Sequence, residues 1–144
     1  MAGMNTWNEK IIAEFRANDG RVGGPFQGAP LTLIHHQGRA SGHEYVSPVM
    51  YLAHESDAAI IYVFGSKGGA PTHPDWYYNL VSAGRAQVEV GTDTFPVTVN
   101  EIKGAERDRI FAEQARRYPG FADYARKTAG IRTIPVLMLR RTSD

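Results

Sequence analysis

The sequence predicts an α+β fold that is mainly β, in which six short and largely antiparallel strands form a β-barrel. The first observation is composition: 144 residues, of which 42% are hydrophobic and 22% charged, suit one domain with a sizeable core. The second is that tight turns rather than long crossovers join most of the apolar segments, which favours antiparallel pairing. The third is Pro48 inside a strand pattern, because a bulge-prone position in a sheet with few free edges is typical of a barrel. We therefore expect a single domain over residues 1–144, with an amphipathic helix in residues 1–20.

Six segments carry the strand patterns, namely residues 31–37, 44–52, 58–64, 86–90, 94–100 and 134–139. Residues 38–42 form the turn between the first two, and residues 91–93 close a hairpin between the fourth and the fifth. Pro48 has no backbone N–H to give to a sheet. The second strand should therefore have an edge, a bulge or a place where a ligand meets the backbone at this point.

Helices are expected at residues 5–19, 75–83, 104–118 and 121–128. In the first helix Met4, Trp7, Ile11 and Phe15 recur at three- and four-residue spacings, so this apolar stripe should pack on the domain. The alternative is a helix that lies on a membrane surface. The third helix carries arginines that we expect to form a solvated face, with a binding patch as the alternative. They are Arg107, Arg109, Arg116 and Arg117.

Charge, cysteine content and hydropathy exclude several classes of function. The formal net charge of +1 gives no reason to expect nucleic acid as a partner, and the absence of cysteine excludes disulfides, thiolate nucleophiles and iron–sulfur clusters. No secretory signal is seen, nor an apolar run of the roughly 20 residues that span a bilayer, so a cytoplasmic protein is the expectation. His35 and His36 should point to opposite faces of a strand, so no metal site is predicted. No Gly-x-Ser-x-Gly motif supports acyl transfer.

Residues 65–80 combine an apolar strand end, a glycine-rich loop and a helix start, and this order predicts an anion-binding cradle. Thr72 is the expected helix cap, Asp75 its reciprocal partner and Pro74 a first-turn residue. The segment contains neither a Walker loop nor a Rossmann fingerprint. An ordinary glycine-rich turn before a helix is the alternative.

A second glycine-bounded loop, residues 38–42, also supplies a cation and a hydroxyl, from Arg39 and Ser41. Two such loops could clamp one phosphate through charge-assisted hydrogen bonds. They could equally be two surface turns with ordinary exposed cations. Aromatic residues are open to two interpretations as well, since each suits either core packing or the wall of a pocket. They are Trp76, Tyr118, Phe121 and Tyr124.

Taken in order, these motifs resemble the deazaflavin-dependent nitroreductase family, whose members are reductases that use coenzyme F420. The resemblance runs from Asn18 to near the end of the chain. The motifs that carry it are Asn18-Asp19-Gly20, Gly38-Arg39-x-Ser41-Gly42, Ser47-Pro48-x-x-x-Leu52, Ser66-Lys67-Gly68-Gly69-Ala70-x-x-x-Pro74-x-Trp76-Tyr77-x-Asn79-Leu80 and Ile134-Pro135. The resemblance implies a split β-barrel of the flavin-reductase, FMN-binding type.

It also implies a function: transfer of a hydride from C5 of reduced F420 to an electron-poor small molecule. Acceptors in the family include quinones, nitroimidazoles and coumarin-type lactones such as aflatoxins. The coenzyme pairs a planar deazaflavin with a phosphate and a polyglutamate tail, and the cofactor itself carries the redox chemistry.

The resemblance assigns a role to each site residue. Those that would hold the phosphate or tail are Arg39, Ser41, Gly42, Ser66, Lys67, Gly68 and Gly69. Those that would line the ring are Pro48, Val49, Met50, Trp76 and Asn79. Those that would line the substrate pocket are Met50, Tyr118, Phe121 and Tyr124, with Ser66 as the candidate catalytic residue on the substrate side.

The chain departs from the family at three positions. Ala40 stands where relatives often carry Lys, and Tyr45 where they often carry Arg, so two cations for the polyanionic tail are missing. Phe121 replaces a frequent Tyr, which removes a hydroxyl, so efficient activation of nitroimidazoles is not predicted. Two alternatives stay open: a non-catalytic carrier of F420 or lipid, and an FMN-dependent reductase on the same barrel. The sequence is compatible with a monomer and with a homodimer.

Overall fold

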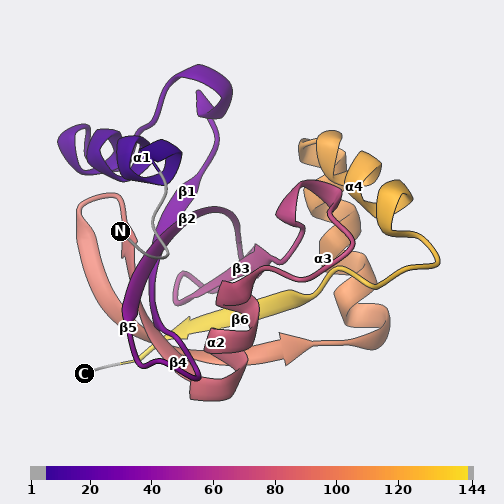
Figure 1. Ribbon diagram of the computed structural model, residues 1–144. Helices are drawn as coiled ribbons and strands as arrows, with labels where there is room; N and C mark the ends of the chain where they lie inside the picture. Colours follow the sequence, from indigo (N-terminus) through magenta and orange to yellow (C-terminus); the bar gives the residue numbers. More distant parts are fainter. Residues whose placement is uncertain (1–5, 143–144) are drawn as a thin grey trace.

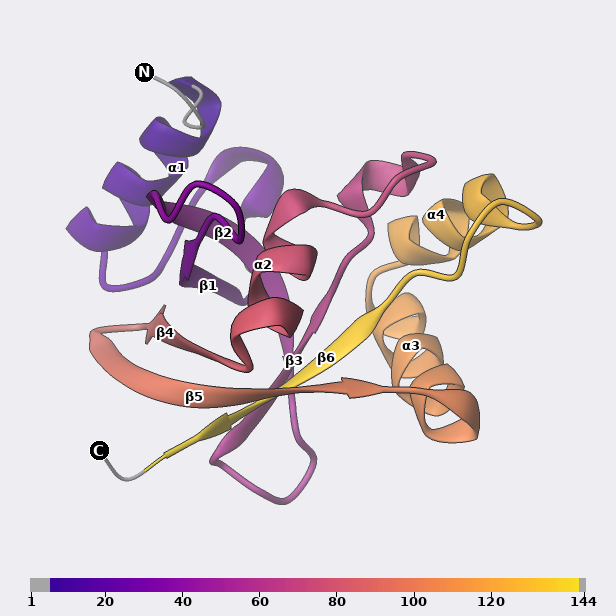
Figure 2. The same ribbon diagram turned by 60° about the horizontal axis from the view of Figure 1, so that its bottom comes forward.

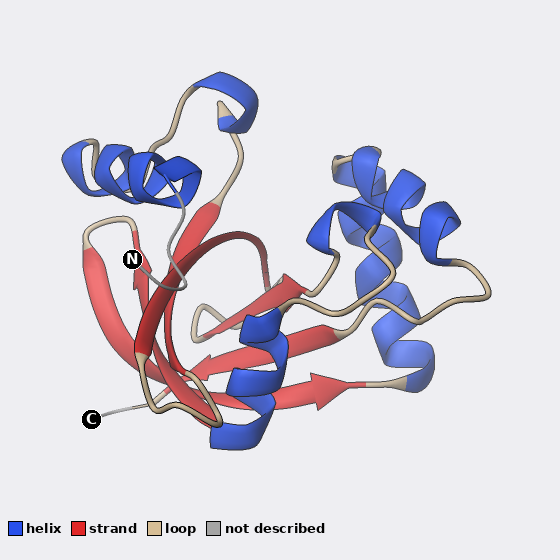
Figure 3. Ribbon diagram, in the orientation of Figure 1, coloured by secondary structure: helices blue, strands red, loops and turns tan. Residues whose placement is uncertain are grey.

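A computed structural model describes residues 6–142, and within them six strands close into a barrel (Figures 1 and 3). The strands pair in the order β1-β2-β3-β6-β5-β4, with β4 returning to β1, and each of these pairings is antiparallel. The predicted fold class is therefore confirmed. The strands are β1 (Leu31–Gln37), β2 (Glu44–Ala53), β3 (Ile60–Phe64), β4 (Arg85–Val90), β5 (Asp93–Ile102) and β6 (Val136–Arg141).

The described residues also form four α-helices and two short 3-10 helices. They are α1 (Thr6–Ala17), η1 (Gly24–Phe26), η2 (Lys67–Gly69), α2 (Asp75–Ala83), α3 (Gly104–Arg117) and α4 (Gly120–Thr128). In both ribbon views α1 lies on one side of the barrel and the α3–α4 pair on the opposite side (Figures 1 and 2). Met4 and Asn5, which were expected in the first helix, lie outside the described residues.

The alternation of side chains along β3 explains why this strand is apolar throughout. Ile61 and Val63 join the cluster that fills the barrel, with residues from β1, β4, β5 and β6 and with Leu80 of α2. Tyr62 and Phe64 belong to the cluster under α3 and α4. Both faces of β3 are thus buried, because successive side chains of a strand point to opposite faces and here each face packs into a different core.

Strands β3 and β6 begin two residues later than predicted, one because side chains bind the preceding turn and the other because of a proline. β3 begins at Ile60 rather than at residue 58, because Asp57 and His54 accept hydrogen bonds from backbone N–H groups of the turn. β6 begins at Val136 rather than at residue 134, since Pro135 has no N–H for the ladder.

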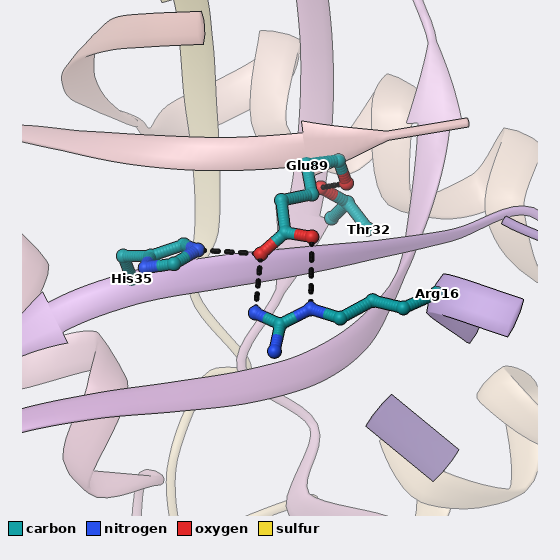
Figure 4. A network of polar contacts seen from close by, with 4 residues as sticks. All are labelled: Arg16, Thr32, His35 and Glu89. Carbon is teal, nitrogen blue, oxygen red and sulfur yellow. Dashed lines mark hydrogen bonds and ion pairs between the residues drawn. The ribbon is translucent and has the colours of Figure 1, made fainter. Parts of the chain in front are cut away.

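α1 packs on the barrel as expected, through Ile11, Ile12 and Phe15, while Trp7 is 51% exposed. An ion-pair network also ties it to the sheet (Figure 4). Arg16 donates two hydrogen bonds to the Glu89 carboxylate, at 3.1 and 2.7 Å, and His35 Nε2 lies 2.6 Å from the same carboxylate. The Arg16 hydrogen bonds lower the pKa of Glu89, and the carboxylate therefore stays ionised.

Two local predictions are wrong. Thr72 does not cap α2: the helix begins at Asp75 with Pro74 at the N-cap, and the Thr72 hydroxyl accepts a hydrogen bond from Lys67 Nζ at 3.2 Å. Arg107 is not part of a solvated face. Its guanidinium donates to the carbonyl of Ile134 and lies 4.6 Å above the ring of Phe111, so it fastens α3 to the chain before β6.

Candidate functional site

The two predicted loops line one cavity of about 650 Å³, and residues of α2 lie between them. In the β1–β2 turn, Gly42 N–H donates to the carbonyl of Gly38 at 2.8 Å, which closes the loop. The backbone N–H of Arg39 donates to Asn79 Oδ1 at 3.0 Å and so ties this turn to α2. The Arg39 guanidinium lies 4.8 Å from the centre of the Tyr78 ring. Arg39 itself lines the cavity, so this contact holds one cation beside it.

The other loop has the backbone geometry of an anion-binding nest. Ser66 is in the right-handed helical region (φ −73°, ψ −36°), and Lys67 follows in the left-handed region (φ 47°), which is unusual for a residue other than glycine. Successive N–H groups converge in this conformation. No described residue accepts a hydrogen bond from the backbone N–H of Ser66, Lys67 or Gly68. The loop therefore presents three unused donors beside the Lys67 ammonium group.

Close packing explains why this loop needs its glycines. Gly69 has φ 84°, and a Cβ placed on it would come within 2.8 Å of Lys127 Cδ on α4. A Cβ on Gly65 would lie 2.7 Å from Cγ of Pro135. Distances below 3.0 Å require neighbouring atoms to shift. The loop is thus fixed between α4 and the chain before β6.

A chain of hydrogen bonds, buried at its centre, connects four residues that line the larger cavity. The Arg39 N–H bond fixes the orientation of the Asn79 amide, so Asn79 Nδ2 donates to His36 Nδ1 at 3.0 Å. The ring proton of His36 is then on Nε2, which donates to Ser47 Oγ at 2.9 Å. Burial, with a smaller effect of His35, lowers the pKa of His36 to about 4. A neutral imidazole therefore leaves the Ser47 hydroxyl hydrogen free to donate into the cavity that Ser47 lines.

A second, smaller cavity of about 300 Å³ adjoins the first, and the two share Lys67, Pro74 and Trp76 in their walls. One wall is the part of β2 around Pro48, where residues 44–50 pair with β1 alone and pairing with β3 starts at Tyr51. The opposite wall is aromatic, with the rings of Phe121 and Tyr124 centred 5.2 Å apart. Of the three alternatives expected at Pro48, an edge, a bulge or a ligand contact, the pairing shows an edge. A flat apolar group fits such a slot.

The structure brings most of the predicted site residues together. Those that line the larger cavity are Arg39, Ser41, Lys67, Trp76 and Asn79. Those that line the smaller one are Pro48, Val49, Met50, Ser66, Lys67, Gly68, Trp76, Phe121 and Tyr124. Three predicted residues line neither cavity: Gly42, Gly69 and Tyr118. Gly42 and Gly69 shape their loops, and Tyr118 packs against the cluster under α3 and α4.

Several residues of the cavities were not predicted from the sequence. His36 was considered only as a metal ligand, although a histidine on the buried face of a strand with a nearby serine is also typical of a hydrogen-bonded core group. Tyr45 was treated as a missing cation, whereas its ring stacks on His36 with centres 5.6 Å apart. Phe26 and Phe64 also line the smaller cavity, and no sequence motif marks them.

Another hollow, of about 920 Å³, lies between α1 and residues 17–30 and contains neither of the two loops. Its charged lining residues are Glu14, Asp19 and Arg21, so negative charge is in excess, which suits an anion poorly. The residues that the structure describes hold no group of three or more His, Asp or Glu side chains that could bind a metal ion. Each helix within residues 6–142 is too short or too polar to cross a bilayer.

Comparison with known proteins agrees with this geometry. A family model described as F420H(2)-dependent quinone reductase matches residues 7–141. An F420H(2)-dependent quinone reductase of Mycobacterium tuberculosis is 31% identical over 135 residues, which cover 90% of this chain and 86% of that protein. The solved structure of an F420-H2 dependent reductase, FDR-A, superposes with a TM-score of 0.66 and 31% identity, over 77% of this chain and 94% of that one.

A second solved structure, described as a domain-swapped dimer, has a TM-score of 0.68 and 30% identity, over 92% of this chain and 93% of that one. The resemblance to F420-dependent reductases that the motifs indicated is therefore confirmed over nearly the whole chain. The chain belongs to the F420H(2)-dependent quinone reductase family, whose members are oxidoreductases that use the reduced deazaflavin coenzyme F420.

Proposed function

We propose that this protein transfers a hydride from reduced F420 to a quinone or a similarly flat, electron-poor acceptor. One observation carries the proposal: a cavity lined by two cations shares Lys67, Pro74 and Trp76 with a smaller cavity that has one aromatic wall, and the loop with the unused backbone donors contributes to both. The coenzyme is likewise divided into a charged stem, which suits the polar cavity, and a planar ring, which suits the apolar one.

The polar cavity fits a phosphate. Arg39 and Lys67 line this cavity and supply positive charge. The unused N–H groups of Ser66, Lys67 and Gly68 supply donors where it adjoins the smaller cavity, which all three of these residues line. Asp75 is the one carboxylate among the described residues that line this cavity, and it is exposed at the first turn of α2. Charge-assisted hydrogen bonds to a phosphate are each worth about 1.5–3 kcal/mol, more than one exposed carboxylate offsets.

When bound, the coenzyme supplies the hydride, and the chain's own residues orient the reactants and exclude water. Pro48, Val49 and Met50 form one wall for a ring, and Phe121 and Tyr124 form the other. Ser66 lines this cavity, and its hydroxyl can donate to an oxygen of the acceptor. This position makes Ser66 the candidate catalytic residue on the substrate side.

The aromatic wall bears on the choice of acceptor. Phe121 contributes a ring without a hydroxyl, so among these residues only Tyr124 places a phenol at this wall. We therefore expect quinones and α,β-unsaturated lactones of the coumarin or aflatoxin type to be better acceptors than nitroaromatics. These acceptors share a flat, electron-poor ring, which the slot between β2 and α4 suits.

The proposal is tested with purified protein, reduced F420 and menadione under anaerobic conditions, followed by the visible absorbance of the oxidised coenzyme. We expect acceptor-dependent oxidation, and a parallel panel with a coumarin and a nitroimidazole ranks the acceptors. Tight F420 binding without turnover on any acceptor would identify a carrier instead. A protein that is yellow as purified, or that binds FMN more tightly than F420, would identify a flavin enzyme.

A further inference from the structure

Arg132, in the segment between α4 and β6, binds the nest from behind. Its guanidinium donates three hydrogen bonds to backbone carbonyls: Nη1 to Gly65 at 3.0 Å, Nη2 to Ser66 at 2.9 Å and Nε to Ala70 at 2.9 Å. Nη1 also lies 2.8 Å from His73 Nδ1. One side chain thus holds both ends of the loop, from 62 to 67 residues away in the sequence.

The direction of these carbonyls fixes the direction of the donors. In a trans peptide the C=O of one residue and the N–H of the next point to opposite sides. Because the carbonyls of Gly65 and Ser66 point at Arg132, the N–H groups of Ser66 and Lys67 point away from it. Ser66 and Lys67 line the smaller cavity on that side. The third carbonyl belongs to Ala70, and the next residue, Pro71, has no N–H to orient.

We propose that Arg132 is a positioning residue that orients the N–H groups of Ser66 and Lys67 toward the phosphate of bound F420. This inference rests on the proposed function. Arg132 does not line either cavity, so it acts through the loop and not by contact with the coenzyme.

The shape of the guanidinium matters as well as its charge. Its planar fork donates to three carbonyls at once, whereas a lysine ammonium is a point charge at the end of a flexible chain. Burial lowers the pKa of Arg132, but an arginine stays charged at any physiological pH. Burial also lowers the pKa of His73, and the positive charge of Arg132 lowers it further. His73 is therefore neutral, and its Nδ1 accepts a hydrogen bond from Arg132.

The test compares Arg132→Lys and Arg132→Met with Arg107→Met as the matched control. Arg107 is also an arginine that donates to a backbone carbonyl. Its acceptor is Ile134, two residues after Arg132, and its hydrogen bonds go to this carbonyl and to the neighbouring Asp108, not to the nest. Each protein is titrated with F420 and with the same deazaflavin lacking the phosphate. We expect both Arg132 variants to bind F420 about tenfold or more weakly, with unchanged affinity for the phosphate-free deazaflavin. Arg107→Met should change neither affinity.

A measurement on the unmodified protein covers the case in which the Arg132 variants do not fold. In ¹⁵N-labelled protein, F420 should shift the amide protons of Ser66 and Lys67 downfield, and the phosphate-free deazaflavin should not. Undiminished F420 binding by folded Arg132→Lys, or unshifted amides on F420 binding, would overturn the inference and leave the proposed function standing. If the unmodified protein bound no F420, both would be overturned.

Discussion

At the scale of single residues, Lys67 combines two properties that can be separated. Its side chain carries a charge beside both cavities, which Lys67 lines. Its backbone is in the left-handed region, which costs on the order of 1–3 kcal/mol for a residue other than glycine. Strain of this kind at a ligand-facing loop is typical of functional sites.

Two substitutions of Lys67 separate the effect of its side-chain charge on binding from the effect of its backbone strain on stability. Lys67→Ala and Lys67→Gly should each weaken F420 binding by about 1–3 kcal/mol, because both remove one charge-assisted contact. Lys67→Gly should also stabilise the fold by about 1 kcal/mol, because glycine adopts this φ without strain. Fluorescence titration and urea unfolding measure the two effects, with the exposed Lys103→Ala as the control. Unchanged dissociation constants would show that Lys67 is a surface cation.

His36 makes the stability of the fold depend on pH. Its pKa falls from the usual 6.5 to about 4 in the folded protein, so between these values the unfolded chain binds more protons. The contribution of neutral His36 to the free energy of unfolding is therefore fully present above pH 6.5. It decreases as the pH falls toward 4, by up to about 3 kcal/mol. Urea unfolding at pH 7 and at pH 4.5 should show a smaller loss for His36→Gln than for the unmodified protein. Equal losses would contradict the buried, neutral imidazole.

At the scale of elements, the ion pair of Glu89 with Arg16 fastens α1 to the sheet (Figure 4). Only 14% of this side chain is exposed, and Arg16 and His35 are its partners. Because the pKa of Glu89 is lowered in the folded state, its contribution is present above the ordinary carboxylate pKa and is lost as the pH falls through the lowered value.

Glu89→Gln should therefore destabilise the protein by about 0.5–1 kcal/mol at pH 7, and less at low pH. The control is Glu113→Gln on α3, which removes a carboxylate whose two arginine partners are exposed and should change stability much less. Chemical unfolding at both pH values gives the comparison. Equal effects of the two changes would mean that α1 is held by its apolar face alone.

Local patterns predicted some elements to the residue and missed others for physical reasons. Residues 31–37 and 75–83 were predicted with the observed bounds, because hydrophobic periodicity and turn residues act within the segment. Thr72 failed as a cap because Lys67 and the Pro74 N-cap determine the helix start. Arg107 was predicted on a solvated face and Arg132 was given no role, because their partners are carbonyls distant in the sequence, which leave no side-chain pattern.

At the scale of the whole molecule, the closed barrel places two loops, far apart in the sequence, on either side of α2 (Figure 2). The sequence predicted both loops separately, but their distance from each other follows only from the pairing of β1 with β2 and of β3 with β6. The hydrogen bond from Arg39 N–H to Asn79 then ties the first loop to α2, the helix that follows the second loop. From spacing alone, the two loops were either one phosphate clamp or two separate surface turns. The resemblance to the family assigned both loops to one coenzyme.

A crystal structure with F420 bound tests the central claim most directly. We predict phosphoryl oxygens within about 3 Å of the N–H groups of Ser66 and Lys67, and the deazaflavin ring against Pro48, Val49 and Met50. A phosphoryl group in the hollow beside α1, or elsewhere far from Arg39 and Lys67, would contradict the account.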